Sequence, residues 1–149
     1  MIVPHFFQGS PQTCGPACLR MVFAALGVSQ TETAIAIACQ TVQAGCTIPD
    51  LVAGAHSFGF SAAILTIGDE QQAQDALAND VPFVAMIDLA SLQPSLPLFQ
   101  WHFVVSLGLV NGDVLFHDPV DGPDRRVAKT DFLLAWETAG YLGVRVWTP

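Results

Sequence analysis

The segment 14–26 is apolar on every face except at Arg20, and it limits how this chain can fold. A surface helix covers a core with one face, whereas a helix that is apolar all round must be enclosed. Pro16 near its beginning and Gly27 just past its end mark the expected helix boundaries. With 149 residues, 52% apolar and 12% charged, the chain can build a core that encloses such a helix. We therefore expect one domain over residues 1–149.

The hydrophobic pattern divides the rest of the chain into a helical half and a half rich in strands. Helices are expected over residues 31 or 33 to 42, 47–58, 69–79 and 130–136, the last capped by Thr130. Strands are expected over residues 60–67, 81–89, 101–107, 113–118 and 141–147, with a proline-containing loop over 91–100. Helices followed by strands indicate an α+β domain with an antiparallel sheet.

The charges and hydropathy argue against several kinds of partner. Thirteen Asp and Glu residues and five Lys and Arg residues give a net charge of −8, with no basic stripe. This charge would repel a phosphate backbone, so we expect no nucleic-acid partner. No run reaches the ~18 to 20 apolar residues of a membrane span, and residues 1–10 lack the regions of a secretory signal. We therefore expect no membrane insertion and a cytoplasmic location.

The four cysteines, Cys14, Cys18, Cys39 and Cys46, have no CxxC spacing, and only one histidine lies near the later pair. We therefore expect neither a zinc site nor a disulfide framework, and no cofactor. Three of the thiols are interpreted as small core residues. Cys14 differs because it opens the buried helix, where unpaired N–H groups and the helix dipole favour a thiolate.

A cysteine nucleophile needs a base, and the second half of the chain offers His102 at the beginning of an expected strand. Asp118 ends the next strand and could orient the imidazole and stabilise its cation. Gln8, six residues before Cys14, could donate to an oxyanion together with the Cys14 N–H. Each residue alone has a commoner interpretation, as a core thiol, a surface histidine, a strand-ending turn or a solvated glutamine.

The turn between the two strands decides whether His102 and Asp118 can meet. A two-residue turn at 111–112 would direct the two side chains to opposite faces of the sheet. A wide loop over 108–112, or an equivalent bulge, would bring them to the same face. With the wide loop we expect Asp118 to face His102 and the neighbouring His117 to be a solvated strand residue.

The order and surroundings of these residues carry a family resemblance. The matching blocks are Gln8-Gly-Ser-Pro-Gln-Thr-Cys14-Gly15-Pro16-Ala17-Cys18-Leu19-Arg20-Met21-Val22, His102-Phe103-Val104-Val105, Asn111-Gly112-Asp113 and Asp118-Pro119. Together they resemble the C39 peptidases, which include the cysteine protease domains attached to bacteriocin-exporting ABC transporters. Residues 45–59, Phe132 and Trp136 extend the resemblance over nearly the whole chain.

The resemblance implies a papain-like fold, with N-terminal helices packed on the antiparallel sheet. It implies that Cys14 is the nucleophile, His102 the base, Asp118 the orienting acid and Gln8 the oxyanion donor. Thr13 departs from the family pattern, which usually has an acidic residue beside the nucleophile.

The family also implies a substrate, a leader peptide cut after a double glycine. We expect a stand-alone domain without the transporter, so that any ABC exporter would be a separate partner. Two other functions remain open. A peptidyl transferase similar to phytochelatin synthases would pass the acyl group to an amine, and a non-catalytic C39-like module would bind peptides without cutting them.

Overall fold

Helix α1 (Cys14–Ala25) is the buried helix that the sequence predicts. Eight of its residues are buried, and Gly27 follows it with φ +90°, a left-handed conformation that favours glycine. Its one charged residue, Arg20, donates from Nε to the Gln30 carbonyl (3.1 Å) and lies 4.1 Å from the centre of the Phe6 ring. The guanidinium is therefore accommodated at the boundary of an otherwise apolar environment.

The computed structural model describes residues 1–92 and 100–149, so most of the loop expected over 91–100 lies outside the described residues. The other helices are α2 (Glu32–Ala38), α3 (Ile48–Ser57), α4 (Glu70–Ala78), α5 (Leu89–Leu92) and α6 (Lys129–Thr138). The strands are β1 (Ser61–Ile64), β2 (Phe83–Asp88), β3 (Trp101–Val110), β4 (Asp113–Asp118), β5 (Gly122–Ala128) and β6 (Gly143–Trp147).

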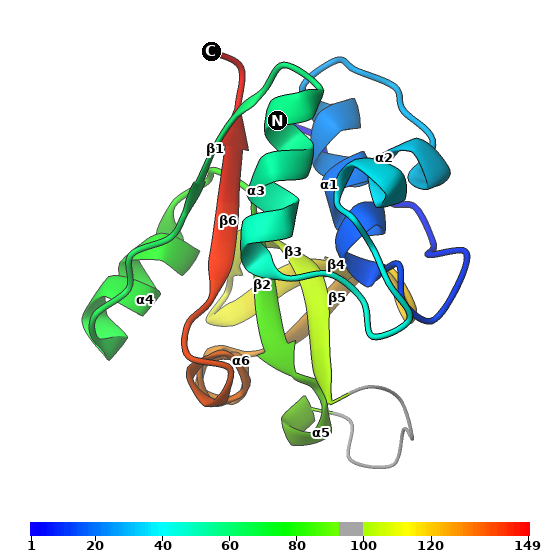
Figure 1. Cartoon of the computed structure of the whole chain (residues 1–149). Helices are drawn as coiled ribbons and strands as arrows, with labels where there is room; N and C mark the ends of the chain where they lie inside the picture. Colours follow the sequence, from blue (N-terminus) through cyan, green and yellow to red (C-terminus); the bar gives the residue numbers. More distant parts are fainter. Residues whose placement is uncertain (93–99) are drawn as a thin grey trace.

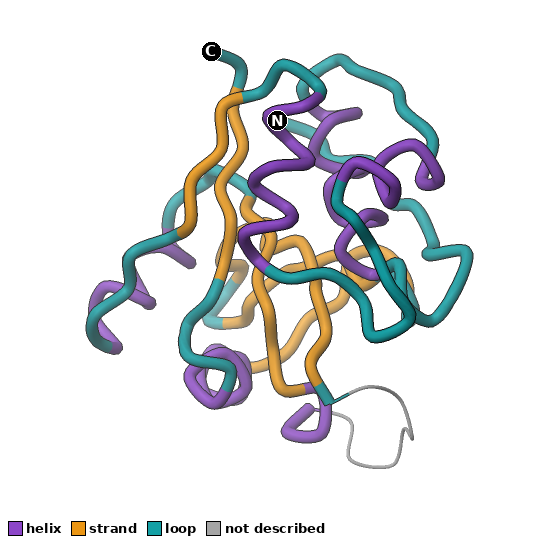
Figure 2. Tube along the Cα trace, viewed as in Figure 1, coloured by secondary structure: helices purple, strands orange, loops and turns teal. Residues whose placement is uncertain are grey.

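All six strands join one antiparallel sheet in the order β1-β6-β2-β3-β4-β5, which confirms the expected α+β class. Apolar side chains fill both of its faces. One core lies between the sheet and α1, α2 and α3, and the other between the sheet and α4 and α6 (Figure 1). Figure 2 shows the same arrangement, with the strands as the central layer. None of the helices in residues 1–92 and 100–149 has the length and apolar character that a membrane span requires.

Side-chain caps explain where two of the short helices begin. Thr31 accepts a hydrogen bond from the Ala34 N–H at the start of α2. Thr47 and Asp50 form a reciprocal capping box at the start of α3. Helix α2 ends at Ala38, four residues before the expected end at residue 42. Gln40 adopts φ +52°, a left-handed backbone conformation that ends a right-handed helix.

Two elements of the second half differ from expectation. Strand β5 was not predicted because its sequence, Gly-Pro-Asp-Arg-Arg-Val-Ala, has three consecutive charged residues and no apolar alternation, and because it lies largely exposed at the edge of the sheet. Helix α6 begins at Lys129 with Ala128 at its N-cap and no side-chain cap, so the prediction that Thr130 caps it was wrong. It follows β5 directly and therefore begins where that strand ends.

Candidate active site

A bulge in β3 places His102 and Asp118 on the same face of the sheet. The turn itself is the tight one, since Val110 pairs with Asp113 across residues 111–112, and the wide loop over 108–112 is absent. The register then shifts between Ser106 and Gly108. This one-residue shift reverses the alternation of side chains, as the equivalent bulge was expected to do.

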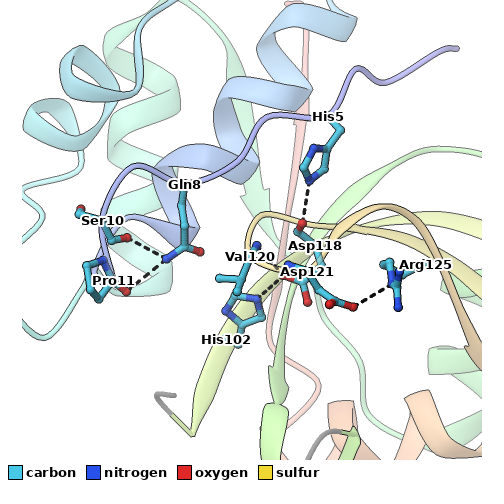
Figure 3. A network of polar contacts seen from close by, with 9 residues as sticks. All are labelled: His5, Gln8, Ser10, Pro11, His102, Asp118, Val120, Asp121 and Arg125. Atoms are coloured by element: carbon cyan, nitrogen blue, oxygen red, sulfur yellow. Dashed lines mark hydrogen bonds and ion pairs between the residues drawn. The ribbon is translucent and has the colours of Figure 1, made fainter. Parts of the chain in front are cut away.

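The imidazole of His102 meets the carboxylate of Asp118 directly. His102 Nε2 donates to Asp118 Oδ1 at 2.8 Å, and both side chains are buried. The same oxygen also accepts from the N–H groups of Val120 (2.8 Å) and Asp121 (3.2 Å) (Figure 3). Although burial raises the pKa of Asp118, these hydrogen bonds and the imidazolium charge lower it below its ordinary value. The carboxylate therefore stays ionised.

The same contacts keep His102 protonated. Burial lowers the pKa of His102, but hydrogen bonds with Asp118 and Cys14 outweigh that effect and raise the pKa to about 9. Because Nε2 is bound to Asp118, Nδ1 is the ring nitrogen left for the Cys14 thiol. Thus three predicted site residues, Cys14, His102 and Asp118, come together at the first residue of α1 and the facing ends of β3 and β4.

Cys14 is partly exposed and lines a cleft of about 570 Å³. The lining is mainly apolar and includes Met86, Trp101 and Phe103. Gly15 lets the start of α1 lie close to Cys46, which also lines the cleft, because a Cβ at Gly15 would lie 2.9 Å from Cys46 Sγ. A thiol at the end of a helix is thus open to a molecule bound in the cleft.

The other three thiols have different environments. All four cysteines are free, and Cys18 and Cys39 are buried in the core as expected. Cys46, expected in the core, is instead only partly buried and lines the same cleft as Cys14. Burial raises the pKa of Cys18 well above its ordinary value and that of Cys39 and Cys46 to about 12. At neutral pH these three groups are therefore protonated thiols.

We expect iodoacetamide at about pH 6.5 to modify Cys14 well ahead of Cys18, Cys39 and Cys46. Cys14 lies at the N-terminus of α1 beside the cationic His102, which is the kind of environment in which cysteines react fastest, whereas the other three thiols stay protonated. Peptide mass spectrometry after timed alkylation measures the four rates. Cys46 is the internal control because it shares the cleft, and equal rates at Cys14 and Cys46 would contradict this description of the thiols.

Gln8 lies in the loop before α1, with its amide nitrogen directed to local carbonyl groups. Nε2 donates to Ser10 O at 2.8 Å and makes a longer contact of 3.4 Å to Pro11 O (Figure 3). Its Oε1 is buried and has no hydrogen-bond partner within the described part of the chain. Thr13 Oγ1 also donates to Ser10 O (3.0 Å), so the loop is fixed by its own polar groups.

The prediction that His117 is a solvated strand residue was wrong. His117 is buried, and its Nδ1 accepts from the Asp124 N–H at 3.1 Å. Nε2 therefore carries the hydrogen, which it donates to the Val3 carbonyl at 2.7 Å. Sequence reasoning missed this because the partner is a main-chain carbonyl 114 residues away, which no local pattern indicates.

We expect His117→Ala to lower the free energy of unfolding by about 2 kcal/mol, because it leaves the Val3 carbonyl and the Asp124 N–H without their partner. Urea unfolding followed by circular dichroism measures the change. His56→Ala is the matched control, since His56 is exposed in the last turn of α3. A loss no larger than in His56→Ala would refute a structural role for His117.

The fold was compared with solved structures of known proteins. It matches the peptidase domain of Streptococcus ComA, a bi-functional ABC transporter involved in quorum sensing, with a TM-score of 0.79, 21% identity and coverage of 97% of both chains. It also matches a double glycine motif protease from an AMS/PCAT transporter, solved in complex with the leader peptide (TM-score 0.79, 18% identity, 99% and 93% coverage). A putative C39-like peptidase from Bacillus anthracis gives a TM-score of 0.76 at 16% identity, with 99% and 95% coverage. The fold is therefore that of the C39 peptidase domains.

The sequence assigns the family. The model of the Peptidase C39 family matches residues 3–142, and the chain belongs to this family. An uncharacterized protein from Methanothermobacter marburgensis is 30% identical over 115 residues, which cover 77% of this chain and 70% of that protein.

Proposed function

We propose that this chain is a cysteine peptidase in which Cys14 is the nucleophile, His102 the general acid and base, and Asp118 the residue that orients the imidazole. The observation that carries the proposal is the buried His102–Asp118 hydrogen bond of 2.8 Å beside a thiol at a helix N-terminus. The contacts raise the pKa of His102 to about 9, so His102 begins the reaction as an imidazolium. In the proposed mechanism Cys14 attacks in its thiolate form.

The reaction follows from these charges. The Cys14 thiolate attacks the peptide carbonyl carbon, and the carbonyl oxygen becomes an oxyanion. His102 gives its proton to the leaving amine, the C–N bond breaks, and a thioester remains on Cys14. His102 then takes a proton from water, the hydroxide attacks the thioester, and the C–S bond breaks. The carboxylic acid product leaves, and the thiolate and imidazolium are restored.

The proposed substrate is an extended peptide in the cleft, cut after a double glycine. Membership of the C39 family and the similarity to a double glycine motif protease bound to a leader peptide support this choice. A peptide of this kind would reach the enzyme before export, and two of the structural neighbours are peptidase domains of ABC transporters, so an ABC exporter is the partner we propose.

The test uses a synthetic leader peptide with a Gly-Gly pair and matched peptides in which either glycine is Ala. Mass spectrometry is expected to find cleavage after the second glycine, and slower cleavage of both Ala peptides. Cleavage of all three peptides at the same rate would contradict the double-glycine preference. Added amine separates hydrolysis from transfer, because a ligated product in place of the free acid would identify a transferase.

We expect Gln8→Ala to lower kcat by about 10²-fold, with a small effect on stability. Gln8 Nε2 makes only a long contact with the Pro11 carbonyl. In the proposed mechanism the N–H of that contact donates to the oxyanion instead. Steady-state kinetics on the cleaved peptide measures the loss. Gln71→Ala removes an exposed glutamine of α4 and should change kcat little. A Gln8→Ala enzyme as active as this control would exclude Gln8 from the mechanism.

A further inference from the structure

The segment 3–8, which we call the N-terminal strap, is fixed along the end of β4. Its hydrogen bonds follow one another in order along the strap and along the end of β4. The Val3 carbonyl accepts from His117, His5 Nε2 donates to the carbonyl of Asp118 at 2.7 Å, and the Gln8 N–H donates to the carbonyl of Pro119 at 2.9 Å. The strap thus contacts three consecutive residues, the middle one of which binds His102.

Asp118 needs such a support because regular strand pairing holds its main chain on only one side. The pairing of β4 with β3 ends at His117 and Val105, one residue before Asp118. On the other side Asp118 pairs with Gly122 of β5, after a further shift of register. Pro119 follows and has no N–H to donate. The His5 ring supplies a donor to the Asp118 main chain where the sheet does not continue.

The His5 ring is itself held in place. It packs edge-on against Phe7, with ring centres 4.6 Å apart, and against His117, with ring centres 5.5 Å apart, both at an interplanar angle of 82°. His117 is fixed in turn by its two hydrogen bonds to main-chain groups. Figure 3 shows the resulting line of contacts from His5 through Asp118 to His102.

We propose that His5 is a positioning residue, which holds Asp118 where its Oδ1 meets His102 Nε2. The inference rests on the proposed function for its consequence in catalysis, but the contact it describes exists without substrate. Hydrogen bonds from Val120 and Asp121 orient the carboxylate relative to its own turn, whereas His5 fixes that turn relative to the rest of the molecule. Loss of the His5 donor lets Asp118 move away from His102.

The experiment follows the ring titration of His102 by NMR in the full chain, with histidine labelled in the ring. His5→Ala is expected to lower the His102 midpoint by about one pH unit, since part of the stabilising contact with a carboxylate is lost. His5→Phe keeps the ring packing without the donor and should give the same fall. His5→Gln restores an N–H donor and should recover most of the shift, whereas the exposed-site control His56→Ala should leave the midpoint unchanged.

An unchanged His102 midpoint in either folded variant, His5→Ala or His5→Phe, would overturn the proposal. If His5→Ala does not fold, His5→Phe supplies the measurement because it preserves the packing against Phe7 and His117. The titration needs no substrate, so its outcome is separate from that of the peptidase test. On a cleaved peptide, the two donor-less variants should lower kcat while KM stays nearly constant, and His5→Gln should recover kcat.

Discussion

Replacement of Cys14 by Ala is expected to abolish peptide cleavage, with a loss of about 10⁴-fold or more in kcat. The variant retains the cleft, His102 and Asp118 but has no atom that can form the thioester. Helix α1 should be preserved, because Cys14 is its first residue and Ala is a good helix former. Mass spectrometry of the peptide products measures the loss.

Cys46→Ala is the matched control for this prediction. Cys46 lines the same cleft, but burial raises the pKa of its thiol to about 12, so it is not a nucleophile at neutral pH. We expect activity within a few-fold of the unmodified chain. If Cys46→Ala lost activity and Cys14→Ala kept it, the nucleophile would be the other thiol of the cleft.

The second large effect is expected at Asp118. Asp118→Ala removes the acceptor of three hydrogen bonds and leaves the His102 ring without its orienting partner, so kcat/KM should fall by about 10²-fold or more. Asp118→Asn should lose less, because all three hydrogen bonds reach one oxygen, Oδ1, which the Asn carbonyl oxygen can replace. The charge alone is then missing.

The pH dependence of these variants follows from the imidazolium. The folded-state pKa of His102 is about 9, above the ordinary 6.5, so its proton is lost as the pH rises through about 9. Activity should fall in that range in the unmodified chain. In Asp118→Asn the alkaline limb of the kcat/KM profile should move toward 6.5, since the carboxylate no longer favours the cation. A limb that stays near pH 9 in this variant would show that Asp118 does not set it.

The same pKa values affect stability. The raised pKa of His102 contributes stability that is fully present below pH 6.5 and is lost as the pH rises through about 9. The lowered pKa of Asp118 also contributes stability, but with the opposite pH dependence: this contribution is present above the ordinary carboxyl pKa and is lost as the pH falls into the acid range. The pair is therefore expected to stabilise the fold most above the acid range in which Asp118 is protonated and below about pH 6.5.

The sequence predicted the parts of this molecule that depend on local patterns. The all-apolar segment and the glycine after it predicted α1, and the order of Cys14, His102 and Asp118 indicated the cluster that the fold brings together. The exact register was not predicted, because Gly108, which adopts φ +118° next to the register shift, was expected to open a wide loop or to belong to an equivalent bulge, and the sequence did not decide between the two. Strand β5 was missed because an exposed edge strand has no apolar alternation.

Contacts between distant segments could not be predicted either. His5 and His117 both bind main-chain carbonyl groups more than 100 residues away, and a carbonyl group has no sequence signature. The position of Cys46 in the cleft is of the same kind, since it depends on how closely the loop at residue 46 approaches Gly15. The chemistry of the site is thus indicated by residue type, whereas its supports are set by tertiary structure.

The most direct test of the proposed nucleophile is the intact mass of the chain after reaction with a Gly-Gly peptide that ends in a vinyl sulfone. The thiolate adds to the vinyl group, so the mass increases by one peptide, and fragmentation locates the adduct. We expect a single adduct on Cys14, formed more slowly in His102→Ala and absent from Cys14→Ala. No adduct on the intact chain, or an adduct that persists in Cys14→Ala, would contradict the assignment of Cys14 as the nucleophile.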